Sequence, residues 1–110
     1  MNLQKESLRS LTKHMELIAK TFFEFKKDQK EILELSDVDQ SDSKHSQNSF
    51  VHRVEEAYSG LNPIEQLFIN NDFFYEEYPE WWKELYTKTQ YTRYMKRAIV
   101  HYLRHFYNED

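Results

Sequence analysis

The sequence predicts an all-α protein, in which one long N-terminal helix accompanies a compact body of three to four helices. Glycine occurs once and proline twice in 110 residues, so the residues that interrupt helices are nearly absent. Apolar residues recur at steps of three and four along the chain, and nothing alternates with the period of two that a strand needs. An aromatic content of 16% lets a chain of this length bury enough apolar area to fold.

Residues 1–35 are expected to form the long helix, which we call the arm. Its helix spans about residues 3–35, and its apolar stripe consists of Leu8, Leu11, Met15, Ile18, Phe22, Phe25, Gln29 and Ile32. Such a helix is longer than a compact body of this size, so one end should overhang or the helix should bend. We expect the stripe to pack on the chain's own aromatic helices, and the alternative is a homodimer through residues 8–32. Leu17 and Phe23 fall outside the stripe and are candidate partner-binding residues.

Residues 36–49 are polar and acidic and have almost nothing to bury, so they are predicted to be a mobile linker. The helical body then occupies residues 50–110. Its first helix starts at Phe50 and ends at Gly60, a residue type suited to the left-handed position after a helix.

Two short helices are predicted next in the body, before the last helix. Asn62, Pro63 and Glu65 form a capping signal for a helix that turns Ile64, Leu67 and Phe68 inward and frays around residues 70–72. Pro79 opens a short helix that ends near Tyr86. Because neighbouring helical residues point about 100° apart, one of Trp81 and Trp82 should lie in the core and the other at least partly in solvent. Both are candidate partner-binding residues.

The last helix is predicted over residues 88–107. Thr87 and Gln90 have the spacing of a capping box. The apolar face of the helix consists of Tyr91, Tyr94, Met95, Ala98, Ile99, Tyr102, Leu103 and Phe106.

The order of helices over residues 63–107, with a turn at Thr87, has helix-turn-helix spacing. Away from its apolar face, the last helix carries side chains that suit phosphates and base edges. The candidate nucleic-acid-binding residues are Lys88, Gln90, Thr92, Arg93, Lys96, Arg97 and Arg104. All the cations among them, including Arg93, would supply charge, and Gln90, Thr92 and Arg93 would supply selectivity. The alternative interpretation is that any amphipathic helix carries Lys and Arg on its solvated face.

Two stretches carry a resemblance to known proteins. They are Leu61-Asn62-Pro63-Ile64-Glu65-Gln66-Leu67-Phe68-Ile69 and Tyr86-Thr87-Lys88-Thr89-Gln90-Tyr91-Thr92-Arg93-Tyr94-Met95-Lys96-Arg97-Ala98-Ile99. Together they resemble sigma-factor region 4, and more closely the ArpU-type phage late-transcription regulators and small proteins of wall-less bacteria with the same pattern. The resemblance covers about residues 61–106 and implies a sequence-reading helix at 88–106 and a role in transcription. The chain departs from the pattern at residues 78–85, where such folds usually have a helix of small residues and this sequence has two tryptophans.

Charge is unevenly distributed along the chain. The net charge is −4, but residues 36–80 carry ten acidic and two basic side chains, and residues 81–107 carry six basic and one acidic. A polyanion would therefore be repelled by the middle of the chain and attracted to the last helix.

Several function classes lack their signatures in this sequence. The absence of cysteine excludes disulfides and a cysteine nucleophile, and no apolar run reaches the length of a membrane span, so a cytoplasmic protein is expected. The acid pairs Glu55-Glu56 and Glu76-Glu77 are interpreted as solvated, and His101 and His105 as surface side chains and not metal ligands. No glycine-rich phosphate loop or nucleophile elbow occurs. We therefore expect no catalytic residues, metal or cofactor, and a protein that is not an enzyme.

Two functions remain. The leading hypothesis is a transcription-associated regulator that binds DNA and/or RNA polymerase through the basic last helix. The alternative is a protein-interaction module that uses the arm and exposed aromatic residues to bind an unidentified protein, with no nucleic acid.

Overall fold

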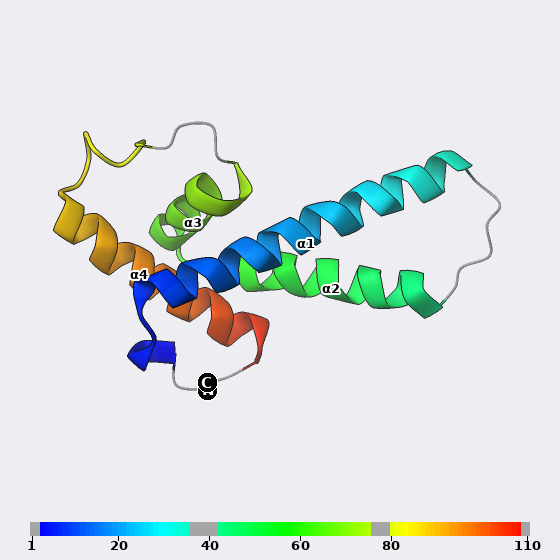
Figure 1. The fold of residues 1–110 in the computed structure, drawn as a ribbon, viewed down its shortest axis with the longest axis horizontal. Coiled ribbons are helices and arrows are strands. Elements are labelled where there is room, and N and C mark those ends of the chain that lie inside the picture. The colour runs from blue at the N-terminus through cyan, green and yellow to red at the C-terminus, as the bar shows by residue number, and fades with distance from the viewer. Residues whose placement is uncertain (1–2, 36–41, 76–79, 109–110) are drawn as a thin grey trace.

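The computed structural model describes residues 3–35, 42–75 and 80–108. The all-α prediction is confirmed, because these residues form helices and turns and contain no strand. In chain order the elements are η1 (Leu3–Lys5), α1 (Leu8–Leu35), α2 (Asp42–Ser59), α3 (Pro63–Ile69), the π-helical turn η2 (Asn70–Phe74) and α4 (Lys88–Phe106). Figure 1 shows α1 and α2 side by side as a hairpin that projects from the part of the molecule containing α3 and α4.

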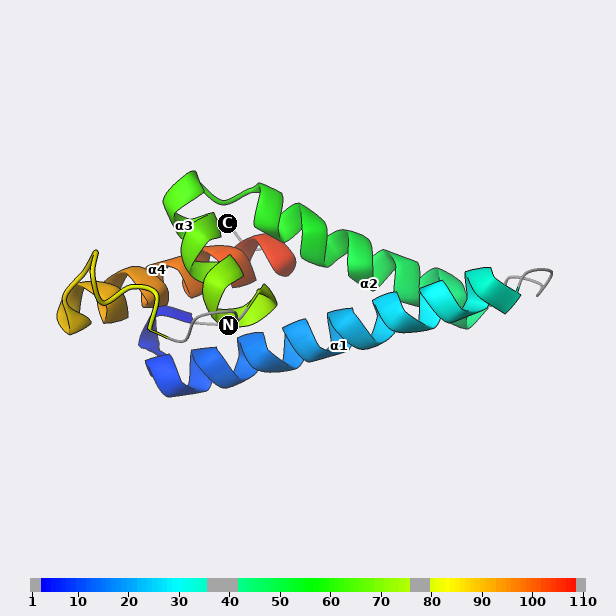
Figure 2. The ribbon, with the colours of Figure 1, turned by 90° about the horizontal axis from the view of Figure 1, so that it is seen from above.

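The projecting hairpin gives the molecule an elongated shape. Its principal dimensions are 52, 31 and 22 Å, and its radius of gyration is 15.8 Å, above the value of about 13 Å expected for a compact chain of this size. The overhang predicted for the long helix is therefore present. Figure 2 shows that the C-terminal end of α1 and the N-terminal end of α2 project together.

The predicted linker over residues 36–49 is wrong for its second part, because α2 begins at Asp42 and not at Phe50. Residues 36–41 lie outside the described part of the chain. Asp42 and Ser43 are residue types that favour a helix start, and polar residues such as Lys and Gln have good helix propensity. The apolar pattern, which begins only at Phe50, could not reveal this polar half of the helix.

The arm packs on the rest of the chain, as predicted. Leu11, Met15 and Ile18 are buried in the common core. Farther along α1, Phe22 contacts Phe74 at 5.6 Å and Phe25 contacts Phe50 at 5.3 Å between ring centroids. The side chains of Gln29 and Ile32 lie outside the described part. Because Leu11, Met15 and Ile18 are covered within the chain, this part of the stripe offers no open surface for the alternative homodimer through residues 8–32.

Helix α4 lies at the centre of the fold and contacts α1, α2 and α3. The predicted apolar face is confirmed, with Tyr91 and Tyr94 half-buried. Its fully buried members are Met95, Ala98, Ile99, Tyr102, Leu103 and Phe106. Val100, which the predicted face did not include, is also buried. Burial of Val100 means that the middle of α4 is covered on more sides than an amphipathic pattern indicates.

Helix α3 starts with the predicted capping box, in which Glu65 N donates to Asn62 Oδ1 at 2.8 Å and Asn62 N donates to Glu65 Oε1 at 3.2 Å. The predicted inward face is correct for Phe68 but wrong for Ile64 and Leu67, which are 56% and 42% exposed. The buried face runs instead through Glu65, Phe68 and Ile69. Glu65 fills its predicted capping role and in addition turns toward His101 on α4.

Two predictions about helix ends are wrong. The chain does not fray after α3, because η2 continues it and places Phe73 in the core. Gly60 follows α2 as predicted, but its φ is not positive. The reason for a small residue there is a close neighbour: a Cβ on Gly60 would lie 3.1 Å from the ring of His105.

The predicted helix that ends near Tyr86 is also wrong where the structure describes it, because residues 80–85 form successive turns; its predicted start at Pro79 lies outside the described residues. Their backbone bonds run from Lys83 N to Glu80 O at 3.1 Å and from Tyr86 N to Trp82 O at 2.8 Å. We call residues 80–86 the turn segment. The expected helix-turn-helix therefore lacks a regular helix before its turn.

Candidate nucleic-acid interface

The candidate interface begins at the capped start of α4. Thr87 Oγ1 accepts a hydrogen bond from Gln90 N at 3.1 Å, and Gln90 Oε1 accepts one from Thr87 N at 3.0 Å, so the predicted capping box is confirmed. The box orders the first turn of α4 and fixes the direction of the residues that follow. It also occupies the side-chain carbonyl of Gln90, which the sequence had assigned to reading bases.

Three of the predicted cations gather on the N-terminal half of α4. Arg93 and Arg97 are exposed, and Lys96 is half-buried beside them. With 3.6 residues per turn and 1.5 Å per residue, Arg93 and Arg97 point within about 40° of each other and lie about 6 Å apart along the axis. Within the described residues none of the three forms an ion pair. We call Arg93, Lys96 and Arg97 the cation group.

The other predicted residues do not join this group. Arg104 points in nearly the same direction as Arg93, but Val100 lies between them on the same side of α4 and is buried. Lys88 and Thr92 are exposed but point about 100° or more away from Arg93 around the axis. The structure therefore limits the cationic surface to the first half of α4.

Both tryptophans pack against this half of the molecule. The prediction that one tryptophan lies in the core is wrong, since Trp81 and Trp82 are both half-buried, whereas the prediction that the other is at least partly in solvent is correct. Trp81 Nε1 donates to Asp72 Oδ1 at 2.8 Å, and the Trp82 ring stacks on Tyr91 at 4.4 Å with 16° between the planes. Separate partners for the two rings explain why turns replace the expected helix.

Tyr91 connects the turn segment to α4 through Asp72. Its hydroxyl donates a hydrogen bond to Asp72 Oδ2. Burial of the ring, followed by that hydrogen bond and by the nearby charge of Asp72, raises the pKa of Tyr91 above its usual range. The hydroxyl therefore remains a donor at neutral pH. Asp72 thus holds Trp81 and Tyr91 together, and we call these three residues the Asp72 latch.

A small cavity opens beside the cation group, where the turn segment meets α3 and α4. Its volume is about 160 Å³, and we call it the aromatic hollow. It is lined by Asn62, Ile64, Glu65, Phe68, Tyr86, Tyr94 and Arg97. Tyr86 and Tyr94 meet edge to face with ring centroids 5.5 Å apart, and both contact Phe68. The hollow therefore combines three aromatic rings with one carboxylate and one guanidinium.

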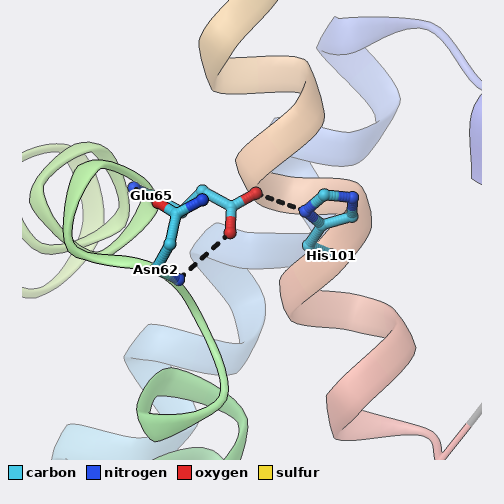
Figure 3. Close-up of polar contacts among 3 residues, drawn as sticks. All are labelled: Asn62, Glu65 and His101. Carbon is cyan, nitrogen blue, oxygen red and sulfur yellow. Dashed lines mark hydrogen bonds and ion pairs between the residues drawn. The ribbon is translucent and has the colours of Figure 1, made fainter.

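Among the residues whose side chains the structure describes, Glu65 is the one charged residue that is buried, at 6% exposure. Figure 3 shows its carboxylate between two partners: Oε1 accepts the Asn62 backbone N–H, and Oε2 bonds with His101 Nδ1. Burial of a carboxylate is costly unless such partners satisfy it. His101 is therefore a structural partner of α3, which the sequence did not reveal because the two residues are 36 positions apart.

The second pocket lies between α1, α2 and η2 and has a volume of about 680 Å³. We call it the aromatic groove. Its aromatic lining consists of Phe22, Phe23, Tyr58, Phe74 and Tyr75, and the Lys26–Glu55 ion pair, at 3.3 Å, also borders it. Of the predicted partner-binding residues on α1, Phe23 lines this groove. Leu17 is 64% exposed and points about 120° away from Phe23, so the two share no face.

Neither a family model, a curated protein nor a solved structure matches this chain. Among the described residues, no cluster of three or more histidine or acidic side chains is arranged to hold a metal ion. None of the helices in these same ranges has the length and apolar character to cross a membrane.

Proposed function

We propose that the protein binds nucleic acid through the N-terminal half of α4 and acts as a transcription-associated regulator. The observation that carries the proposal is the cation group. Like charges four positions apart on a helix repel each other, so Arg93 and Arg97 cost stability when nothing neutralises them. The chain has an excess of acids, yet none of the described ones pairs with this group. A phosphate backbone would supply the missing negative charge.

The role in transcription is supported by the sequence resemblance of residues 61–106 to sigma-factor region 4 and to ArpU-type regulators. In this proposal α4 is the contacting helix and DNA and/or RNA polymerase the partner. The chain departs from that pattern in the turn segment, which replaces a helix. In addition, the capping box occupies the side-chain carbonyl of Gln90. Binding is therefore expected to depend chiefly on the cation group.

The test is the affinity of a double variant, Arg93→Gln with Lys96→Gln, for fluorescently labelled DNA. The matched control is Lys13→Gln with Lys20→Gln, which removes the same charge from exposed positions on α1. Loss of two phosphate contacts should weaken binding at low salt by about tenfold or more in the α4 variant only. Equal affinities for the two variants would show that any binding reflects overall charge and not this site.

A role in transcription has its own experiment, which is affinity capture from the native lysate with and without nuclease. Recovery of RNA polymerase subunits, or of DNA that nuclease removes, is the expected result. The Arg93→Gln/Lys96→Gln variant should recover less of either. Unchanged recovery by that variant would remove α4 from the interaction.

The second candidate function is a protein-interaction module, and the aromatic groove favours it. Phe23 is 46% exposed beside this groove, and large aromatic side chains are common anchors of interfaces. Under this hypothesis Phe23→Ser should abolish capture of a protein partner, whereas Leu17→Ser, on another side of α1, should not. Such an apolar interface should respond little to salt, unlike binding through phosphates.

A further inference from the structure

We propose that the aromatic hollow seats one unpaired base of a single nucleic-acid strand, while the cation group holds the adjacent phosphates. This inference rests on the proposed function and specifies the form of nucleic acid that the site takes. It is carried by the position of the hollow: Arg97 belongs to both the cation group and the lining of the hollow. A strand bound to the arginines would therefore have its bases within reach of Tyr86 and Tyr94.

The size and lining of the hollow suit a single planar ring. Its volume of about 160 Å³ is below the several hundred Å³ of pockets for larger ligands, and a cavity of about 150 Å³ is known to hold one benzene ring. Tyr86 and Tyr94 are half-buried and supply aromatic surface on which any base can stack, and the fully buried Phe68 supports both rings from the core side. The walls thus favour a flat, uncharged, aromatic guest.

The two charges of the hollow orient that guest. Glu65 lies buried in the lining, whereas Arg97 is exposed. A phosphate is repelled by the carboxylate and attracted to the guanidinium, so the backbone stays outside and the base points inward. The carboxylate oxygens of Glu65 keep acceptor capacity beyond their bonds to Asn62 and His101, which suits the N–H groups on a base edge. A cation would be opposed by Arg97 and a free anion by Glu65.

The burial of α4 favours a single strand over a duplex. A helix that reads duplex DNA lies in the major groove with its side chains on the bases. Here α4 contacts α1, α2 and α3, and Val100 interrupts its exposed side. Bases in a duplex are stacked and paired and cannot enter the hollow, whereas those of a single strand can.

The Asp72 latch holds one wall of the hollow in place. Tyr86 ends the turn segment, and its backbone N–H bonds to Trp82 O at 2.8 Å. Trp81, in the same segment, is tied to Asp72, and Trp82 stacks on Tyr91. The wall is therefore ordered before a base arrives, which reduces the entropy lost on binding.

The test compares variants that fill the hollow with variants that do not. Ile64 lines it, is 56% exposed and can be enlarged without disturbing the core; Leu67, 42% exposed on the same helix, does not line it. Binding of Ile64→Phe, Leu67→Phe and the natural protein is measured by fluorescence anisotropy. The probes are single-stranded DNA and RNA of about 12 nucleotides and the DNA duplex of the same sequence. Comparison of the DNA and RNA probes shows which of the two kinds of single strand the protein binds.

The natural protein should bind at least one single strand more tightly than the duplex. Ile64→Phe should weaken single-strand binding by about fivefold or more, the loss expected when one stacked base is displaced, and Leu67→Phe should not. Tyr86→Leu should weaken it similarly, whereas Tyr86→Phe, which keeps the ring, should retain it. Natural affinity in both Ile64→Phe and Tyr86→Leu would overturn the base site while leaving the proposed function intact. Absence of binding to every probe would overturn the proposed function itself.

Discussion

The two halves of α4 have opposite surroundings although they belong to one continuous helix. Over residues 88–97, Met95 is the one buried side chain, and the cation group and two half-buried tyrosines share the surface. Over residues 98–106, six of nine side chains are buried and the helix lies in the core of the molecule. The comparison shows that the position of a residue along a helix, as well as its face, decides whether it can contact a partner. Arg93 and Arg104 point the same way, but only Arg93 adjoins the other members of the cation group.

The largest expected effect comes from the buried half. Leu103→Ala should lower the free energy of unfolding by about 2–5 kcal/mol, because Leu103 is fully buried and its truncation leaves a cavity. Arg93→Ala, in the exposed half, should change it by less than about 0.5 kcal/mol. Denaturant unfolding of both variants measures the difference. Similar losses for the two would contradict the contrast between the halves.

A second prediction concerns the contact between Glu65 of α3 and His101, in the core half of α4. Glu65→Ala should cost about 1–3 kcal/mol of stability, because it removes the reciprocal half of the capping box and leaves His101 without its partner. Glu65→Gln should cost less, since an amide oxygen can still accept the Asn62 N–H. A double-mutant cycle with His101→Gln measures the coupling, and a coupling of zero would show that the Glu65–His101 bond contributes nothing.

Each half of α4 contains a tyrosine whose pKa is raised, and the two pKa values have different causes. Burial raises the pKa of Tyr102, in the core half, and burial together with Asp72 raises the pKa of Tyr91. Below about pH 10 both are protonated in the folded and unfolded states alike. Above that pH the unfolded chain ionises first, so the stability of the folded state should fall as pH rises.

An alkaline titration of these two tyrosines has an internal control. Asp72→Asn removes a negative charge and weakens a hydrogen bond at Tyr91, and should lower the pKa of that residue only. Ultraviolet absorbance of the phenolates follows the ionisation, with Tyr91→Phe and Tyr102→Phe to assign the steps. A shift of Tyr102 in Asp72→Asn would indicate that the latch and the core are not separate.

Much of the fold could be predicted because its signals are local. The apolar stripes of α1 and α4 and both capping boxes follow from residues three or four positions apart. The polar start of α2 could not be predicted, since nothing apolar marks residues 42–49. The turn segment was misassigned because the local helix signal at Pro79 competes with partners outside the segment: Asp72 binds Trp81 and Tyr91 stacks on Trp82.

The candidate site was predictable only in part for the same physical reason. The cations of the last helix stand out in the sequence by composition. Arg104 is separated from the cation group because Val100, between them on the same side of α4, is buried. The sequence pattern places Val100 on the polar face of the helix, so this burial could not be predicted. The aromatic hollow requires α3, the turn segment and α4 to meet, and no spacing along the chain indicates which residues line it.

The central claim is that the N-terminal half of α4 contacts phosphates, and the salt dependence of single-strand binding tests it most directly. Binding of the natural protein should weaken steeply as salt rises from about 50 to 200 mM, because bound cations release counterions from the strand. For Arg93→Gln/Lys96→Gln the slope of log K against log salt should be shallower by about 1.4, which corresponds to two lost contacts to a single strand. The Lys13→Gln/Lys20→Gln control should keep the natural slope. Identical slopes for all three proteins would contradict the account, because phosphates would then be contacted elsewhere.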